Sequence, residues 1–212
     1  MGRTEQNFKI VLFQLTTLVT GGTCGIGSLF VEELSEMGAI VHTCSRNEAE
    51  LHQRLQEWNA KGFKVSGSVC DASSRDQRTE LIEKVSSIFN GKLNILINNV
   101  GSNIRMLTVD YSVEEYSYLL ATNFDAVFIS SVAALIDISS GSIYGVTKGA
   151  INQLTRNLAC EWAKEGIRVN CVAPWYIKIS LVEHLICVYL GHDHYRSEFG
   201  ELPRNILTCS LF

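Results

Sequence analysis

The sequence lacks several features that would point to whole classes of protein. Its 212 residues include only two prolines, no run of 18 apolar residues and no pair of cysteines spaced C-x-x-C. A membrane-spanning helix is therefore not expected. The seven cysteines, an odd number, predict neither a disulfide framework nor a zinc site. A reducing compartment fits this cysteine usage best, and we expect a cytoplasmic protein with no membrane partner.

An excess of positive charge is missing as well. Eighteen Lys and Arg residues stand against 22 Asp and Glu residues, which gives a formal charge of −4. Because nucleic-acid backbones are bound through basic faces, nucleic acid is a poor candidate partner. The composition, with 46% hydrophobic and 19% charged residues, is typical of one compact globular domain.

Short apolar segments alternate with amphipathic segments along most of the chain. We expect strands at residues 16–20, 39–44, 64–70, 93–100, 126–132 and 167–173, and helices at about 26–37, 47–60, 75–89, 113–122 and 145–164. This alternation predicts βαβ units and a mostly parallel sheet with helices on both faces. The expected fold is a Rossmann-type doubly wound α/β domain, in which ligands bind beyond the carboxyl ends of the strands.

A glycine-rich turn, TGGTCGIG, follows the first expected strand and precedes a helix. Gly21, Gly25 and Gly27 permit a sharp turn and the close approach of a pyrophosphate, while the helix N-terminus supplies free N–H groups. Thr23 and Ile26 complete the predicted cofactor-binding turn. Glycine-rich turns also serve as tight strand-to-helix connections that bind no ligand. The position of this turn, after the first expected strand and before a helix, is what favours nucleotide binding.

The ends of the next two expected strands carry further candidate cofactor residues. Ser45 and Arg46 stand where an NAD-binding chain usually offers Asp or Glu to the ribose. A hydroxyl and a guanidinium suit a 2′-phosphate, so NADP(H) is the expected cofactor, although an exposed loop Arg without a ligand is the alternative. Asp71 either faces the adenine or caps the following helix. Asn98 and Gly101, in NNVG, either leave room for a ribose or form only a turn.

The stretch GSIYGVTKGA places Tyr144 and Lys148 four residues apart on an expected helix, where they would be neighbours on one face. A nearby ammonium lowers a phenol's pKa from about 10 toward neutrality, so this Tyr can pass a proton at physiological pH. Ser131, thirteen residues before Tyr144, ends an expected strand and can share a substrate oxygen with the phenol. An isolated Y-x-x-x-K spacing often arises by chance. The occurrence of all these motifs in this order is what favours a catalytic role for Tyr144 and Lys148.

Together these motifs resemble the short-chain dehydrogenase/reductase family, and most closely its tropinone reductase-like group. The resemblance covers residues 16–183 and implies NADPH-dependent reduction of a small ketone or oxidation of the matching alcohol. By this resemblance Ser131 holds the carbonyl oxygen, Tyr144 donates the proton, and Lys148 lowers the Tyr pKa and binds the nicotinamide ribose. Asn123 matches the family's fourth catalytic residue, which supports a proton relay through water.

The chain departs from the family pattern after Asn123. Only eight positions separate it from Ser131, so the family's long helix, which returns the chain to the start of the next strand, is missing. An intact strand at 126–131, rising about 3.3 Å per residue, would place its ends roughly 16–20 Å apart, and it would keep Asn123 away from Ser131 unless the strand is shortened or displaced. By family resemblance the missing helix would form much of the subunit interface and cover apolar surface, so its loss counts against the homo-oligomer that the family would otherwise suggest.

Other departures concern the cofactor site and the C-terminus. Cys24 stands where NADP-preferring members carry a basic residue, and Ile179 stands where a Thr follows the cofactor-binding proline, here Pro174. Residues 184–212 do not resemble the family's final elements. We therefore expect an NADP(H)-binding domain at 1–183 with a six-stranded sheet that lacks its seventh strand, followed by a divergent segment at 184–212.

The sequence supports two alternatives to an active enzyme. The chain could be a catalytically impaired, truncated protein of the same fold that binds nucleotide or a partner, or an incomplete product that folds poorly alone. His192 and His194 form H-x-H without a third ligand at a suitable spacing, so no metal site is expected.

Overall fold

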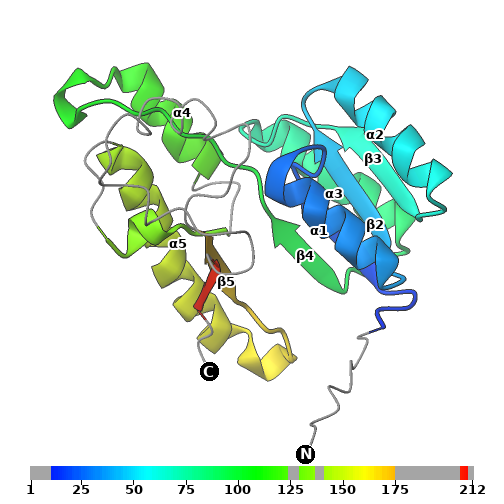
Figure 1. The fold of residues 1–212 in the computed structure, drawn as a ribbon. Coiled ribbons are helices and arrows are strands. Elements are labelled where there is room, and N and C mark those ends of the chain that lie inside the picture. The colour runs from blue at the N-terminus through cyan, green and yellow to red at the C-terminus, as the bar shows by residue number, and fades with distance from the viewer. Residues whose placement is uncertain (1–10, 124–128, 137–140, 175–205, 210–212) are drawn as a thin grey trace, which may run out of the picture. The chain divides into compact units, whose positions relative to one another are not determined.

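A computed structural model describes residues 11–123, 129–136, 141–174 and 206–209 of the chain (Figure 1). Contacts within the chain divide it into two compact units. The first unit consists of residues 1–71 and 76–97, and the second of residues 72–75 and 98–212. The expected domain boundary after residue 183 lies outside the described residues and stays a prediction.

The first unit is built on a four-stranded sheet of order β3-β2-β1-β4. Its strands are β1 (Thr16–Thr20), β2 (Ile40–Ser45), β3 (Val65–Val69) and β4 (Ile95–Asn98), and its helices are α1 (Gly25–Glu36), α2 (Glu48–Ala60) and α3 (Arg75–Ile88). β2 pairs in parallel with both β1 and β3, and the register places Leu18 beside His42 and His42 beside Ser66. The expected parallel α/β sheet is therefore confirmed for these strands.

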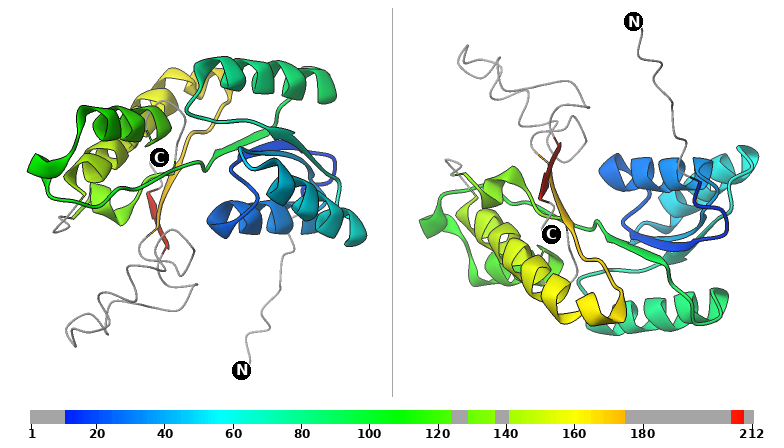
Figure 2. Two further views of the ribbon diagram at one scale, coloured as in Figure 1. Left: turned by 90° about the horizontal axis from the view of Figure 1, so that it is seen from above. Right: turned by 90° about the horizontal axis from the view of Figure 1, so that it is seen from below.

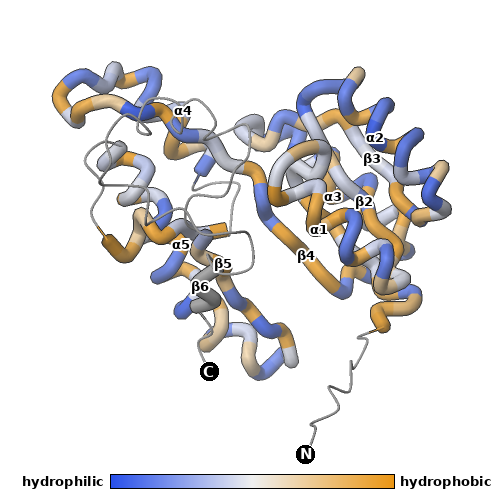
Figure 3. Tube along the Cα trace, in the orientation of Figure 1, coloured by the Kyte–Doolittle hydropathy of each residue, from blue (hydrophilic) through white to orange (hydrophobic). Residues whose placement is uncertain are grey.

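Helices cover both faces of this sheet because its strands are apolar on both sides. Val19 faces α1 and α2, where it packs in one cluster with Val31 and the fully buried Trp58. Leu18 points the other way and packs in a second cluster with Leu81 of α3. Figure 3 shows the apolar run of β4 within this layer. Each large side chain buried in this way contributes about 1.5–3 kcal/mol.

His42 is the largest of the fully buried polar side chains among the described residues of the first unit. His42 of β2 is 0% exposed, with Nδ1 2.8 Å from the Ser66 hydroxyl and Nε2 2.9 Å from the Ser68 hydroxyl. Burial, together with the charge of Lys84, lowers the pKa of His42 to about 4. Because both ring nitrogens have partners on β3, the neutral imidazole is accommodated without an unpaired polar atom.

The second unit contains mostly helices. Its elements are η1 (Thr108–Asp110), α4 (Val113–Asn123), η2 (Val132–Ala134), α5 (Ser142–Glu161), η3 (Ala163–Glu165), β5 (Cys171–Pro174) and β6 (Ile206–Cys209). A capping box starts α4: the Glu115 N–H donates to the Ser112 hydroxyl (3.1 Å), and the Ser112 N–H donates to the Glu115 carboxylate (2.9 Å). α5 runs alongside β5, as the two views of Figure 2 show.

The expected strand at 126–132 is wrong for the residues that the structure describes. Residues 129–131 have no strand assignment, and η2 begins at Val132, while 124–128 lie outside the described residues. Instead of a ladder, the Ile129 N–H donates to the Asn98 carbonyl (3.2 Å) and the Ser130 N–H donates to the Val172 carbonyl (3.0 Å). The Ser131 hydroxyl then accepts from the Ala133 N–H (3.2 Å), which starts a 3₁₀ turn and ends the extended chain.

The expected single sheet of six parallel strands is corrected accordingly. The described strands form a four-stranded sheet and a separate two-stranded pair, in which β5 and β6 run antiparallel with Cys171 beside Cys209. No strand is expected from the sequence of the C-terminal segment, yet β6 lies there. The last strand is therefore altered rather than simply missing.

Candidate cofactor and active-site residues

The glycine-rich turn between β1 and α1 depends on its glycines for two physical reasons. Gly21 and Gly25 have φ angles of 64° and 55°, which favour glycine. A Cβ atom on Gly22 would lie 2.1 Å from the Thr43 hydroxyl oxygen and 2.8 Å from Val31 Cγ2. The turn is therefore pressed directly against β2 and α1. The sequence motif does not single out Gly22, because only the fold brings Thr43 and Val31 to it.

The turn presents a helix N-terminus suited to an anion. Cys24 is exposed and caps α1 without a side-chain hydrogen bond, and the first turn of α1 contains no acidic residue. Gly27 is buried in the first turn, and Ile26 is half-buried beside it. The N–H groups at this end of α1 and its positive dipole end are typical of phosphate-binding turns. These features fit the phosphates of a dinucleotide.

The structure brings the turn together with the end of β2. The Thr23 hydroxyl donates to the Ser45 hydroxyl (3.3 Å), which also accepts the Asn47 N–H (3.2 Å). Arg46 lies between them in the chain and is exposed. At the end of β3, the Asp71 N–H donates to Gln77 Oε1 of α3 (2.7 Å). The predicted residues Thr23 and Ser45 are thus in contact, and Arg46 adjoins Ser45.

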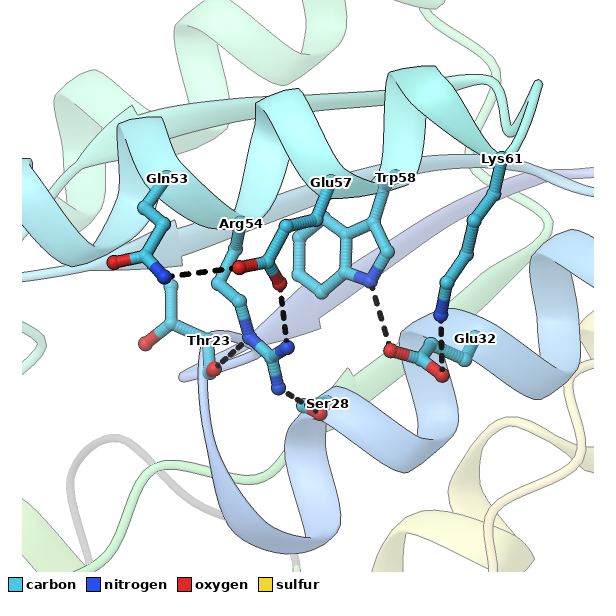
Figure 4. Close-up of polar contacts among 8 residues, drawn as sticks. All are labelled: Thr23, Ser28, Glu32, Gln53, Arg54, Glu57, Trp58 and Lys61. Atoms are coloured by element: carbon cyan, nitrogen blue, oxygen red, sulfur yellow. Dashed lines mark hydrogen bonds and ion pairs between the residues drawn. The ribbon is translucent and has the colours of Figure 1, made fainter.

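A residue that the sequence analysis did not identify also reaches this turn. Arg54 of α2 donates from Nε to the Thr23 carbonyl (2.9 Å) and from Nη2 to the Ser28 hydroxyl (2.9 Å), as Figure 4 shows. Its Nη1 donates to the Glu57 carboxylate (2.8 Å). Nothing in the spacing of Arg54 from the glycine motif indicates this contact, because the packing of α2 beside α1 creates it.

Lys148 is the centre of the second unit's site. Its side chain, from α5, is 3% exposed, and its ammonium donates to the Ile129 carbonyl (2.8 Å). The ammonium lies 5.5 Å from the centroid of the Tyr144 ring. Burial lowers the pKa of Lys148 from 10.5 to about 8. The predicted neighbours Tyr144 and Lys148 are therefore confirmed as adjacent on α5, and their catalytic roles stay a prediction.

Asn123 ends α4 and is fully buried next to this lysine. Its Oδ1 accepts from the Ser102 N–H (2.8 Å), and its Nδ2 donates to the Ser102 carbonyl (2.7 Å). A Cβ atom on Gly101 would lie 3.5 Å from Asn123 Oδ1 and 3.6 Å from Lys148 Nζ. The structure thus gathers Asn123, Lys148 and Gly101 around one point. Asn98 contributes through its carbonyl, which accepts from Ile129.

Ser131 lies close to the start of α5 through η2. Its side chain is 9% exposed and caps η2, and a Cβ atom on Gly145 would lie 3.1 Å from the Ala133 carbonyl oxygen of η2. η2 therefore packs against the turn of α5 that carries Tyr144. The separation expected from an intact strand at 126–132 does not apply, because residues 129–131 are not a strand. Pro174, the remaining predicted cofactor residue, is buried at the end of β5.

Some predictions fall outside the described residues. These are the departure at Ile179 and the H-x-H pair of His192 and His194. Within the part of the chain that the structure describes, no group of three or more His, Cys, Asp and Glu residues could hold a metal ion. In that same part, no helix combines the length and hydropathy needed to cross a membrane.

Comparison with protein families finds two matches along the chain. Residues 15–129 match the family described as short chain dehydrogenase, and residues 119–186 match the one described as enoyl-(acyl carrier protein) reductase. Among curated proteins, a tropinone reductase homolog from Arabidopsis thaliana is 61% identical over 191 residues, which is 81% of this chain and 72% of the homolog.

Two of the solved structures that resemble this chain contain NADP or NADPH, and their sequence identity to it is lower than that of the tropinone reductase homolog. An NADP complex of RhlG from Pseudomonas aeruginosa is 26% identical, with a TM-score of 0.78 over 84% of this chain and 79% of the other. A variant of actinorhodin polyketide ketoreductase with NADPH is 26% identical, with a TM-score of 0.77 over 83% of this chain and 77% of the other.

Proposed function

Because the chain belongs to the short-chain dehydrogenase/reductase family, we propose that it is an NADP(H)-dependent oxidoreductase that reduces a small ketone to a secondary alcohol. The observation that carries this proposal is the buried Lys148, whose ammonium lies beside the Tyr144 ring and close to the Asn123 amide. A buried ammonium next to a phenol is the arrangement that proton transfer at neutral pH requires.

The first unit would hold the phosphate-bearing end of the cofactor. The N–H groups of the turn at Gly21 and Gly25 suit the pyrophosphate, and the Ser45 hydroxyl and Arg46 guanidinium suit the 2′-phosphate. Asp71 would lie toward the adenine. The relatives with NADP or NADPH in their structures support this cofactor for the present chain. When bound, NADPH supplies the hydride.

The second unit would hold the reacting groups. Tyr144 donates its proton to the carbonyl oxygen, while the Ser131 hydroxyl donates a hydrogen bond to the same oxygen. The carbonyl carbon gains the hydride, the oxygen gains the tyrosine proton, and a secondary alcohol leaves. The Lys148 ammonium stabilises the tyrosinate that remains, and Asn123 supports the relay through water that returns a proton from solvent to Tyr144.

The roles of the remaining predicted residues are part of this proposal. Asn98 and Gly101 would leave room for the nicotinamide ribose, which Lys148 would bind, and Pro174 would border the nicotinamide. We also retain a cytoplasmic location as a proposal, whereas the expected loss of the interface helix counts against a homo-oligomer. Exposed apolar side chains of the second unit, among them Val109 (88%) and Val113 (76%), support the expected loss of a covering element.

A titration with NADPH tests the proposal first. Nucleotide fluorescence and thermal unfolding would be followed together, and we expect saturable binding with a rise in melting temperature. A screen of small ketones would follow, with Tyr144→Phe expected to keep NADPH binding and to lose about 10²- to 10⁴-fold in rate. Tyr116→Phe, an exposed tyrosine on α4, is the matched control and should change neither quantity.

Two outcomes would contradict the proposal in different ways. Saturable NADPH binding without turnover of any ketone would favour the catalytically impaired, nucleotide-binding alternative. An absence of binding up to millimolar NADPH would overturn both the enzyme and the nucleotide-binding readings.

A further inference from the structure

The glycine-rich turn carries no positive charge of its own. The stretch TGGTCGIG contains neither Lys nor Arg, and Cys24 is the exposed residue at the start of α1. The guanidinium of Arg54 nevertheless lies against this turn, because α2 packs beside α1 and points Arg54 at the Thr23 carbonyl (Figure 4). A cation thus reaches the turn from a neighbouring helix.

We propose that Arg54 is a second cation for the 2′-phosphate of NADP(H), acting beside Arg46 and contributing to selection of NADPH over NADH. This inference rests on the proposed function, since it concerns the phosphate end of the same cofactor. It adds a specificity-determining residue that the glycine motif and the end of β2 do not contain.

The contacts of Arg54 tie it to the end of β2. Thr23, whose carbonyl accepts from Arg54, also donates from its hydroxyl to Ser45, the residue before Arg46. A chain of contacts therefore runs from Arg54 through Thr23 to the Ser45-Arg46 pair. A 2′-phosphate held by that pair would therefore lie next to Thr23, the residue whose carbonyl Arg54 contacts.

The guanidinium keeps donors for a ligand. An arginine has five N–H donors, and the three contacts of Arg54 to Thr23, Ser28 and Glu57 use one on each of its nitrogens. The remaining N–H groups lie on Nη1 and Nη2. The side chain is 30% exposed, so part of it is open to solvent.

The charge of Arg54 is felt at the turn itself. Partial desolvation of the thiol is the main cause that raises the pKa of Cys24, an exposed residue overall, with Glu50 adding to the rise and Arg54 among the groups that oppose it. Glu57 acts in the opposite sense, because its carboxylate pairs with Arg54 at 2.8 Å and partly neutralises the guanidinium. Removing Glu57 should therefore strengthen the effect of Arg54 on an anion.

The test compares nucleotides with and without the 2′-phosphate. Arg54→Gln would be titrated with NADPH, NADH, 2′,5′-ADP and 5′-AMP, and we expect about tenfold weaker binding of NADPH and 2′,5′-ADP with little change for the other two. Arg54→Lys should retain most of the affinity because it keeps the charge. Glu57→Gln should tighten 2′,5′-ADP binding about two- to threefold.

Lys61→Gln is the matched control. It removes the same charge from the end of α2, but Lys61 donates to Glu32 (3.2 Å), away from the glycine-rich turn. We expect its binding of 2′,5′-ADP to equal that of the unchanged protein within about twofold.

The outcomes that would overturn the inference are distinct from failure of the proposed function. If Arg54→Gln weakens the binding of all four nucleotides equally, Arg54 stabilises the turn and is not a phosphate ligand. Unchanged 2′,5′-ADP binding by this variant would also exclude Arg54 as a phosphate ligand. If Arg54→Gln does not fold, Arg54→Lys and Glu57→Gln still decide by their 2′,5′-ADP affinities. Failure of the unchanged protein to bind any nucleotide would count against the proposed function instead.

Discussion

Different kinds of interaction stabilise each of the two units of this chain internally. In the first unit, regular strand pairing and two apolar layers fix a sheet between helices, and the candidate phosphate-binding residues lie on turns at the carboxyl ends of its strands. In the second unit, single hydrogen bonds hold the extended segment at 129–131, and one of them comes from Lys148. Candidate catalytic side chains of the second unit therefore also support their own surroundings.

This difference predicts how substitutions should behave. In the first unit, damage should come from altered packing of the backbone, and polar changes at the edge should affect ligand binding more than folding. In the second unit, replacing a candidate catalytic residue should cost stability as well as activity. Hydrogen exchange measured on peptides from residues 16–97 and 141–174 would report on each unit separately.

The largest effect is expected from Gly22→Ala in the first unit. Its methyl group would lie 2.1 Å from the Thr43 hydroxyl oxygen and 2.8 Å from Val31 Cγ2, so these side chains or the turn must move, at a cost of about 3 kcal/mol or more of unfolding free energy. Urea unfolding would measure the change. Gly149→Ala on α5 is the control, because a Cβ there meets nothing within 4 Å and should stabilise the helix by about 0.5–1 kcal/mol. Equal changes in unfolding free energy for the two substitutions would refute a steric clash of a methyl group at position 22.

Asn123→Ala should give the next largest effect, confined to the second unit. It leaves the Ser102 N–H and carbonyl without their side-chain partners next to a buried position, which should cost about 2–4 kcal/mol. The loss should appear as faster hydrogen exchange in peptides of the second unit. Asn157→Ala removes an exposed amide of α5 that accepts from Gln153, and we expect almost no change. A similar loss for both variants would argue against a structural role for Asn123.

Acid should weaken the first unit through His42. Its pKa is about 4 in the folded protein and about 6.5 in the unfolded chain, so protons bind the unfolded state more tightly between these values. The stability that the neutral imidazole contributes is present above pH 6.5 and is lost as the pH falls toward 4, by about 2–3 kcal/mol. His42→Gln should flatten this dependence in denaturant unfolding. An unchanged acid profile would show that His42 is not responsible.

Alkali should act on the second unit in the opposite direction through Lys148. Its pKa is about 8 when folded and about 10.5 when unfolded, so the unfolded chain binds the extra proton between these values. Stability from this group should therefore rise as the pH increases from about 8 to 10.5, and the protection of residues 141–174, relative to the base-catalysed intrinsic exchange rate at each pH, should rise with it. Lys148→Met should remove the dependence. A rise that persists in this variant would point to another group.

The smallest effects should come from two helix caps, one in each unit. Asn47 accepts the Glu50 N–H (3.2 Å) at the start of α2, and Ser112 accepts the Glu115 N–H (3.1 Å) at the start of α4. Asn47→Ala and Ser112→Ala should each cost about 1 kcal/mol. Similar losses in thermal unfolding would show that local helix capping is equally strong in the two units. A much larger loss at Ser112 would mean that the capping box supports more of the second unit than its own helix.

Local patterns in the sequence predict most elements of the first unit. β1 lies at residues 16–20 as expected, and α1 begins one residue before its expected start. Alternating apolar residues and a glycine-rich turn carry this information within a few positions. By contrast, the strand expected at 126–132 is wrong over the described residues 129–132, because the backbone N–H groups of residues 129 and 130 meet single hydrogen-bond partners and η2 begins at Val132.

The candidate site could be predicted only in part for a related reason. Tyr144 and Lys148 are neighbours through helix geometry alone, so their spacing is sufficient. The clamp between Asn123 and Ser102 joins residues 21 positions apart, and the contact between Arg54 and Thr23 spans 31 positions. Such contacts depend on how helices and turns pack, and the pattern of a single chain does not specify them.

The lack of space for a side chain at position 22 has a consequence for how this protein can vary in evolution. A side chain at position 22 requires space that Thr43 and Val31 now fill, so its effect depends on what occupies those two positions. The fitness effect of a change at 22 should therefore be epistatic with positions 43 and 31. Smaller residues at both would have to arise first, and a combinatorial library at the three positions should return alanine at 22 only in such backgrounds.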